Sequence, residues 1–283
     1  MKNNNIVAIM YDFDKTLCTK DMQEYTFIPK LGMEASEFWG EVNKVRYENG
    51  MDGVLAYMYL MLKKAKDLNI PIKESDLEKM GSDIELYPGV SEWFKRINEY
   101  GESLGLKIEH YVISSGLNEI ISGSEIAKYF EKIYASEFLY EEGKAVWPKS
   151  AINYTNKTQF IYRINKGILD ICDDDSLNRK MREEDRRISK NNMIYIGDGL
   201  TDVPSMITIK ENGGVSIAVY TDKSKKLAKS LLDEERIDYI AEANYNDNSD
   251  IDRIIKRVLK MMSLKISLKE DNLTIKNSWF FYN

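Results

Sequence analysis

The stretch from Ile6 to Thr16 most constrains the fold that this chain can adopt. Its first part, Ile6 to Tyr11, is an apolar run rich in Ile and Val, with the length of a strand rather than of a helix. Such a run predicts a strand that is buried on both faces, as in a parallel sheet. Two carboxylates, Asp12 and Asp14, follow the run directly. In an open α/β sheet, ligands bind beyond the carboxyl ends of the strands, so these acids stand where chemistry is expected.

The two acids allow more than one interpretation. Asp12 and Asp14 would repel each other in the absence of a cation, because close like charges disfavour double ionisation. A hard divalent cation such as Mg²⁺ prefers carboxylate and water oxygens and would remove this conflict. The pattern Asp-x-Asp-x-Thr is short, however, and a strand that ends in an Asx-type turn can have the same sequence. The choice between a metal site and a plain turn depends on the rest of the chain.

The overall composition excludes several classes of function. The chain has 283 residues, of which 43% are apolar and 30% charged, and its net charge is −6. These values are ordinary for a soluble globular protein, and no run of Lys or Arg is long enough to form a nucleic-acid arm. We therefore expect no nucleic-acid partner. An anionic substrate would have to meet a local positive site rather than a global field.

Three further features of the composition limit where the protein can reside and which catalytic sites it can have. They are the cysteines, the single histidine and the length of the apolar runs. The two cysteines, Cys18 and Cys172, make no disulfide framework and fit a reducing compartment. The polar N-terminus lacks the apolar core of a signal peptide, and no apolar run approaches the length of a membrane span. We expect a cytoplasmic protein with no membrane partner. His110 is the only histidine, which excludes His-based triads and multi-His metal sites.

Strand and helix patterns alternate along most of the chain. After the strand at 6–11, short apolar runs predict further strands, and amphipathic spacing between them predicts helices. This alternation is typical of an α/β fold with a doubly wound parallel sheet. Residues 137–155 contain Gly143, Trp147 and Pro148 between alternating residues and predict a hairpin or flap. The further predicted strands are 108–113, 132–135, 193–196, 215–219 and 237–240, and the predicted helices include 92–100 with Ser91 as N-cap, 117–130, 158–171, 223–232 and 250–262.

Two segments depart from this alternation. Residues 20–85 carry no strand signal but place apolar side chains three and four positions apart, which predicts an insertion of about four helices. We therefore expect a core domain at 1–19 and 86–283 and a helical cap domain at 20–85. The C-terminal extension at about 263–283 alternates and predicts an edge hairpin, or an oligomer contact through its aromatic residues Trp279, Phe280 and Phe281.

Polar residues follow three of the predicted strands at the point where each strand ends. Because parallel strands share a direction, their carboxyl ends meet at one edge of the sheet. Three separate segments should therefore converge on one crevice, which favours a functional site over an isolated turn. The residues at these strand ends are Asp12 and Asp14, Ser114 and Ser115, and Asp198 and Asp202.

The ordered set of motifs resembles the haloacid dehalogenase-like (HAD) superfamily of phosphohydrolases. The first motif is Asp12-Phe13-Asp14-Lys15-Thr16, the second is the strand that ends in Ser114, and the fourth is Gly197-Asp198-Gly199-Leu200-Thr201-Asp202 after an apolar strand. The helical insertion after the first motif is similar to the family's C1-type cap, as in the phosphoserine phosphatase branch. The resemblance implies a Rossmann-like core and covers residues 1 to about 245.

The resemblance also implies roles for the motif residues. Asp12 would attack phosphorus and form an aspartyl phosphate, and Asp14 would protonate the leaving alcohol and then activate water. The resemblance implies a phosphatase in particular, because the family's phosphatases carry a second acid at the position of Asp14. Mg²⁺ would be held by the Asp12 carboxylate, the Asp14 carbonyl and Asp198, with Asp202 supporting the metal ligands from behind. Ser114 would donate to a phosphate oxygen, and Thr16, Ser115 and Gly116 would contribute to substrate binding, the last two through backbone N–H groups at a helix start.

The third motif of the family is a lysine that neutralises the phosphoryl group. Lys157 precedes a predicted helix and matches the family's lysine at a helix start, whereas Lys166 is a rival inside that helix. We prefer Lys157 as the catalytic lysine. For substrate selection, Asp21 or Glu24 could face a substrate amine and Arg46 a carboxylate, but their local context does not match the family, and a surface role is the ordinary one for Arg46.

The sequence therefore predicts a Mg²⁺-dependent phosphomonoester hydrolase that acts on a small phosphorylated metabolite. A phosphotransferase that passes the group from aspartyl phosphate to an alcohol is the alternative within this chemistry. A non-catalytic binding or regulatory protein on the same fold is the alternative outside it, although such proteins usually lose one of the motif acids. The sequence specifies neither the substrate nor an oligomeric state.

Overall fold

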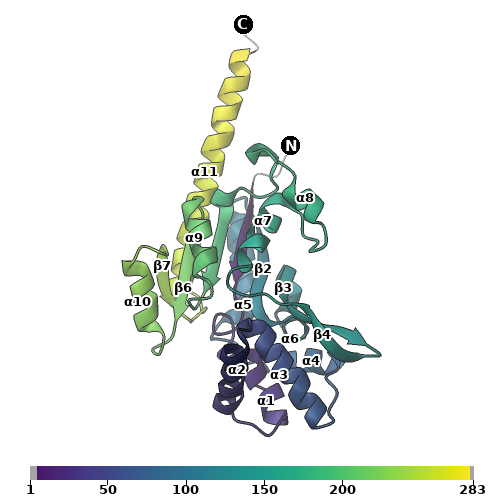
Figure 1. The fold of residues 1–283 in the computed structure, drawn as a ribbon. Helices are drawn as coiled ribbons and strands as arrows, with labels where there is room; N and C mark the ends of the chain where they lie inside the picture. The colour runs from purple at the N-terminus through teal and green to yellow at the C-terminus, as the bar shows by residue number, and fades with distance from the viewer. Residues whose placement is uncertain (1–4, 281–283) are drawn as a thin grey trace.

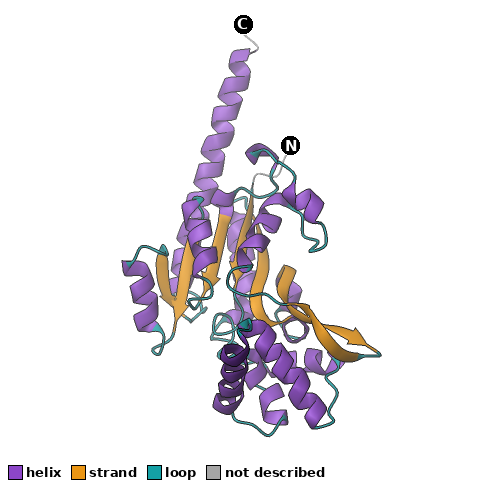
Figure 2. Cartoon of the chain, viewed as in Figure 1, coloured by secondary structure: helices purple, strands orange, loops and turns teal. Residues whose placement is uncertain are grey.

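A seven-stranded sheet forms the centre of the molecule in the computed structural model, which describes residues 5–280 (Figures 1 and 2). The strand order is β4-β3-β2-β1-β5-β6-β7, and all neighbours pair in parallel except β3 and β4. This arrangement confirms the predicted α/β fold with a doubly wound, largely parallel sheet. The strands are β1 (Ile6–Tyr11), β2 (Lys107–Leu117), β3 (Phe130–Glu141), β4 (Lys144–Ser150), β5 (Met193–Gly197), β6 (Val215–Tyr220) and β7 (Tyr239–Glu242).

Helices cover both faces of the sheet, so its central strands are apolar throughout. β1 is buried along its whole length, and its alternate side chains enter two separate hydrophobic clusters. The cluster on one face includes side chains of α5 (Val90–Ser103) and α11 (Asp250–Phe280). The cluster on the other face includes side chains of α7 (Lys157–Lys166), α9 (Val203–Glu211) and α10 (Lys225–Asp233).

A group of helices between β1 and α5 lies at one end of the sheet, opposite the two chain termini (Figure 1). These helices occur where a helical insertion was expected, while the division into core and cap domains stays a prediction. Two linkers join the group to the sheet, and they pair with each other, since Thr19 N donates to Glu85 O and Tyr87 N donates to Leu17 O, both at 3.0 Å. The helices are α1 (Phe27–Lys30), α2 (Ala35–Asn49), α3 (Gly53–Asp67) and α4 (Glu74–Met80), flanked by short 3₁₀ turns at Met22–Glu24 and Gly81–Asp83.

The prediction of a single helix at 117–130 is wrong. β2 continues through the polar residues to Leu117, and only a short helix, α6 (Asn118–Ser122), follows before the chain turns at Gly123. Gly123 packs so tightly on the backbone of Glu78 in α4 that a side chain would collide with it. The helix thus ends at a glycine that also allows close contact with the helical insertion.

Two helix boundaries and one predicted helix cap also differ from expectation. The helix expected to reach 171 ends at Lys166, because Gly167 adopts a left-handed conformation (φ +76°) that terminates α7. α5 begins at Val90 after Gly89, and Ser91 bonds Glu125 instead of capping the helix. The remaining short elements are α8 (Asp174–Asn178) and 3₁₀ turns at Ala127–Tyr129, Glu183–Asp185 and Lys190–Asn192.

The predicted hairpin in the C-terminal extension is also wrong. α11 continues as one helix to Phe280 and projects beyond the sheet (Figure 1). Ile266 follows the buried Met262 by four positions and packs on the core, whereas Leu268 is 68% exposed. The apparent alternation is therefore a helical stripe read over too short a window. The proposed contact through Trp279, Phe280 and Phe281 concerns side chains outside the described part of the chain and stays a prediction.

Candidate active site

The three polar strand ends meet at one edge of the sheet, as expected. β1 lies between β2 and β5, and Tyr11 stands in register with both Val112 and Ile196. The next residue, Asp12, donates its backbone N–H to the carbonyl of Ile196 at 2.9 Å, so the sheet itself holds the backbone of this acid. Ser114 follows Val112 by two positions and is fully buried.

A buried lysine lies between two of the carboxylates. Lys157, the first residue of α7, places Nζ 3.1 Å from Asp12 Oδ1 and 2.8 Å from Asp202 Oδ1. Burial alone would lower the pKa of Lys157, but the charges of Asp12 and Asp202 raise it above its ordinary value. The lysine therefore keeps its positive charge while it contacts both carboxylates. Lys166, the rival from the sequence, lies elsewhere and donates to the carbonyls of Leu177 and Arg179.

Three acids form a cluster suited to a metal ion. Asp12, Asp198 and Asp202 each offer a carboxylate oxygen, and these oxygens lie within 4.8 Å of one another. Burial raises the pKa of Asp12 to about 6, with a further contribution from Asp202 and an opposing one from Lys157. Burial, followed by the charges of Asp202 and Asp12, holds the pKa of Asp198 well above its usual value. A single lysine does not neutralise this set, and its hard oxygen donors fit Mg²⁺.

Asp14 lies beyond the sheet and depends on other contacts. Its Oδ1 accepts the backbone N–H of Met22 at 2.9 Å and lies 3.6 Å from the thiol sulfur of Cys18. Burial, followed by the charges of Asp21 and Asp12, holds the pKa of Asp14 well above its usual value. A carboxyl group with a raised pKa keeps its proton closer to neutral pH, which suits a proton donor.

The segment expected to bind phosphate does not form the helix start that the sequence predicted. Because β2 runs to Leu117, the segment Ser114 to Gly116 is irregular strand rather than helix. Ser114 Oγ accepts the N–H of Gly116 at 3.0 Å, so that backbone donor already has a partner. Thr16 is fully buried, its hydroxyl has no hydrogen-bond partner in the structure, and its carbonyl accepts the hydroxyl of Tyr245. Ser115 lines a cavity.

This cavity, of about 650 Å³, lies between the sheet edge and the helical insertion. Two hydrogen bonds between lining residues join the helical insertion to the rest of the chain: Asp52, the N-cap of α3, accepts Asn153 Nδ2 at 3.0 Å, and Tyr57 donates to the carbonyl of Ser115 at 2.7 Å. The helical insertion thus contributes much of the wall. The lining residues are Asp14, Asp21, Gln23, Trp39, Arg46, Asp52, Gly53, Val54, Tyr57, Ser115, Asn153, Tyr154, Leu200 and Thr201.

Comparison with known protein families shows to which family the chain belongs. The family model described as Putative Phosphatase matches residues 7–232, well over half of the sequence. The chain belongs to the Putative Phosphatase family. A protein of Borreliella burgdorferi, described as uncharacterized, is 29% identical to this phosphatase over 278 residues, covering 88% of this chain and 95% of the relative.

Solved structures share the fold of this phosphatase. A HAD family hydrolase from Salmonella enterica serovar Typhi superposes with a TM-score of 0.57 at 18% identity, covering 85% of this chain and 68% of that protein. A phosphoserine phosphatase, solved as a phospho-aspartyl intermediate analogue, superposes with a TM-score of 0.56 at 18% identity, covering 89% and 99%. The expected HAD-like fold is thereby confirmed. In the described part of the phosphatase, no helix combines the length and apolarity needed to cross a membrane.

Sequence reasoning missed one residue of the phosphatase site, Tyr195, and it named Gly197 only as part of the fourth motif without a role of its own. Tyr195, inside β5, is fully buried and donates its hydroxyl to Asp202 Oδ1 at 2.8 Å. Gly197 allows Asp202 to approach, because a Cβ at this position would lie 2.5 Å from the Asp202 carboxyl carbon. A lone tyrosine hydroxyl in an otherwise apolar strand was the available signal, since a buried hydroxyl usually needs a partner.

Proposed function

We propose that this phosphatase is a Mg²⁺-dependent phosphomonoester hydrolase that acts on a small phosphorylated metabolite through an aspartyl phosphate on Asp12. The observation that carries the proposal is the placement of Asp12 beside Lys157 and two further acids at the carboxyl ends of the central strands. A carboxylate can attack phosphorus without an activating base, provided that nearby positive charge offsets the repulsion between anions. Lys157 supplies such a charge 3.1 Å from Asp12.

Asp14 is proposed as the proton carrier of both steps. In the first step its proton passes to the leaving alcohol oxygen as the bond between that oxygen and phosphorus breaks. In the second step the Asp14 carboxylate removes a proton from the water that hydrolyses the Asp12 phosphate, which regenerates both groups. Its place in the cavity wall and its raised pKa support this double role.

The acid cluster is the proposed metal site. Asp12 and Asp198 would hold Mg²⁺ together with the Asp14 carbonyl, and Asp202 would support the site through its bonds to Lys157 and Tyr195. Bound Mg²⁺ would offset negative charge on the phosphoryl oxygens and the carboxylates. The helical insertion at 20–85 is proposed as a cap domain over the core, since its residues form much of the cavity wall.

Turnover of 4-nitrophenyl phosphate with and without Mg²⁺ tests the proposal. We expect hydrolysis that requires Mg²⁺, stops with a chelator and is lost in Asp12→Asn. Asp233→Asn, at an exposed acid ending α10, is the matched control and should keep full activity. Undiminished turnover in Asp12→Asn would refute the mechanism. Adding alcohols and looking for their phosphate esters distinguishes hydrolysis from phosphoryl transfer, and a panel of phosphorylated metabolites identifies the substrate.

A further inference from the structure

The loop that carries Asp14 is supported from a distant part of the chain. Beyond Asp12 the chain leaves the sheet, and the N–H groups of residues 16–18 turn back onto the Phe13 carbonyl at 2.9 to 3.3 Å. Lys15 within this loop has a positive φ of 57°, which a residue with a side chain rarely adopts. Asp12 is thus fixed by the ladder of the sheet, whereas Asp14 depends on how this loop is held.

Tyr245 holds the loop and the second linker at once. Its hydroxyl donates to the Thr16 carbonyl at 2.8 Å, and its backbone N–H donates to the Pro88 carbonyl at 2.7 Å. Thr16 begins the linker into the helical insertion, and Pro88 ends the linker that returns from it. Gly89 lets the chain approach this closely, because a Cβ there would lie 2.5 Å from the Tyr245 carbonyl carbon.

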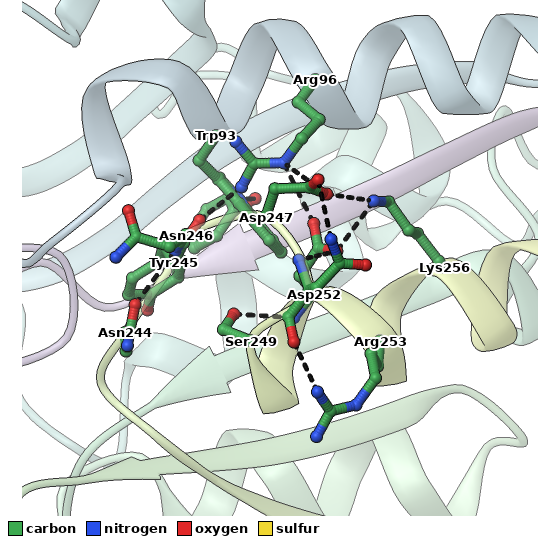
Figure 3. A network of polar contacts seen from close by, with 12 residues as sticks. Trp93, Arg96, Asn244, Tyr245, Asn246, Asp247, Ser249, Asp252, Arg253 and Lys256 are labelled. Atoms are coloured by element: carbon green, nitrogen blue, oxygen red, sulfur yellow. Dashed lines mark hydrogen bonds and ion pairs between the residues drawn. The ribbon is translucent and has the colours of Figure 1, made fainter.

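Tyr245 is itself held rigidly. It is fully buried, and its ring packs edge-on against Trp93 with centroids 5.1 Å apart. Figure 3 shows Arg96 of α5 reaching across to this segment, where it donates to the Tyr245 carbonyl and pairs with Asp252 of α11 at 3.1 Å. Lys256 pairs with Asp252 at 2.8 Å from the other side. The hydroxyl of Tyr245 therefore has a fixed position from which to hold Thr16.

We propose that Tyr245 is a positioning residue that fixes the loop of Asp14 through the Thr16 carbonyl. The inference rests on the proposed function, because it assigns the loop a part in proton transfer. The proposal predicts that the two catalytic acids respond differently. Loss of the Tyr245 hydroxyl should displace Asp14, while Asp12, anchored by β5, remains in place. Protonation of the leaving group should then suffer more than attack on phosphorus.

Tyr245→Phe tests this selectivity, since it removes the hydroxyl and keeps the ring against Trp93. We expect kcat/KM for phenyl phosphate, whose leaving group needs a proton, to fall about tenfold. For 4-nitrophenyl phosphate, whose leaving group departs as a stabilised anion, kcat/KM should stay within about twofold. Tyr134→Phe is the matched control, because Tyr134 is also buried and donates to a backbone carbonyl, that of Leu169. It should leave both substrates unaffected.

Hydrogen exchange gives a readout that does not depend on turnover. Amides of residues 13–19 should exchange faster in Tyr245→Phe than in wild type or in Tyr134→Phe. If Tyr245→Phe does not fold, Arg96→Gln, which loosens the Tyr245 carbonyl, should give the same substrate selectivity. An equal loss on both phosphates, or none on either, would overturn the positioning role. Retained turnover in Asp12→Asn would instead defeat the proposed function, so the two failures are distinguishable.

Discussion

Lys157 and Asp202 form an ion pair with no solvent exposure on either side chain, and the same lysine nitrogen lies 3.1 Å from Asp12. The pair lies at the start of α7 and just before α9, so it joins two elements 45 residues apart in the chain. A buried charge without its partner is costly, and here one cation serves two anions. The lysine therefore contributes both to folding and to the charge balance of the site.

Replacing Lys157 with methionine should cost both stability and activity. The change leaves two buried carboxylates facing each other, so the free energy of unfolding should drop by about 3–5 kcal/mol. The loss of positive charge beside the phosphoryl group should lower kcat by about 10² or more. Denaturant unfolding and steady-state kinetics measure the two effects. Lys166→Met is the control and should keep kcat within about twofold; equal losses in the two variants would contradict the assignment of Lys157.

Replacing Asp14 with asparagine should make the reaction depend more steeply on the leaving group. The amide cannot give a proton to the leaving oxygen, so kcat/KM for phenyl phosphate should fall by about 10²–10⁴, and by less for 4-nitrophenyl phosphate. Removal of water's proton in the second step should also slow, so phosphorylated enzyme should accumulate during turnover of the activated ester. Intact-protein mass spectrometry would detect it. A uniform loss across leaving groups would show that Asp14 is no proton donor.

Much of the fold was predictable because its signals are local. The apolar run of β1, the acids that follow it and the glycine-rich turn after β5 each occupy a few consecutive residues. Parallel strands must then bring these ends to one edge, which is why the motifs alone lead one to expect that Asp12, Asp198 and Asp202 lie together. Lys157 also has a local mark, its place at a helix start.

What could not be predicted depends on contacts between distant segments. The Tyr245 hydroxyl reaches Thr16 across 229 positions of sequence, and nothing near Tyr245 marks it as a neighbour of the loop. The irregular end of β2 is shaped by its pairing with β3, where Leu117 stands opposite Ser136 after a shift in register. This pairing joins segments that are distant in the sequence, so no pattern within residues 114–117 marks it.

Replacing Tyr195 with phenylalanine should weaken the affinity of the site for Mg²⁺ rather than slow the chemical steps. The change removes a 2.8 Å hydrogen bond to Asp202, while Lys157 still holds that carboxylate. Groups behind metal ligands typically contribute about 10–100-fold to affinity, so the Mg²⁺ concentration for half-maximal activity should rise by about tenfold. kcat at saturating Mg²⁺ should stay within about threefold. A titration of activity against Mg²⁺ measures both values, and an unchanged midpoint would rule out this role for Tyr195.

His110, the only histidine, should stay neutral in the folded protein well into acid. It is buried in β2, its Nδ1 lies 3.0 Å from the Tyr11 hydroxyl and its Nε2 lies 2.9 Å from Asn98 Oδ1. Burial lowers the pKa of His110 to about 3, far below the ordinary value of 6.5. The unfolded chain therefore binds one more proton than the folded chain between these pH values. Stability should rise with pH across this window.

The expected slope from this one group is about 1.4 kcal/mol per pH unit, and it should vanish above about pH 6.5. Because there is one imidazole, its NMR signals need no assignment among histidines, and they should not titrate between about pH 7 and pH 5. His110→Gln keeps a polar side chain between Tyr11 and Asn98 and should flatten the dependence of unfolding free energy on pH in this window. An imidazole that titrates near its ordinary pKa of 6.5 in the folded protein would show that burial does not control its charge.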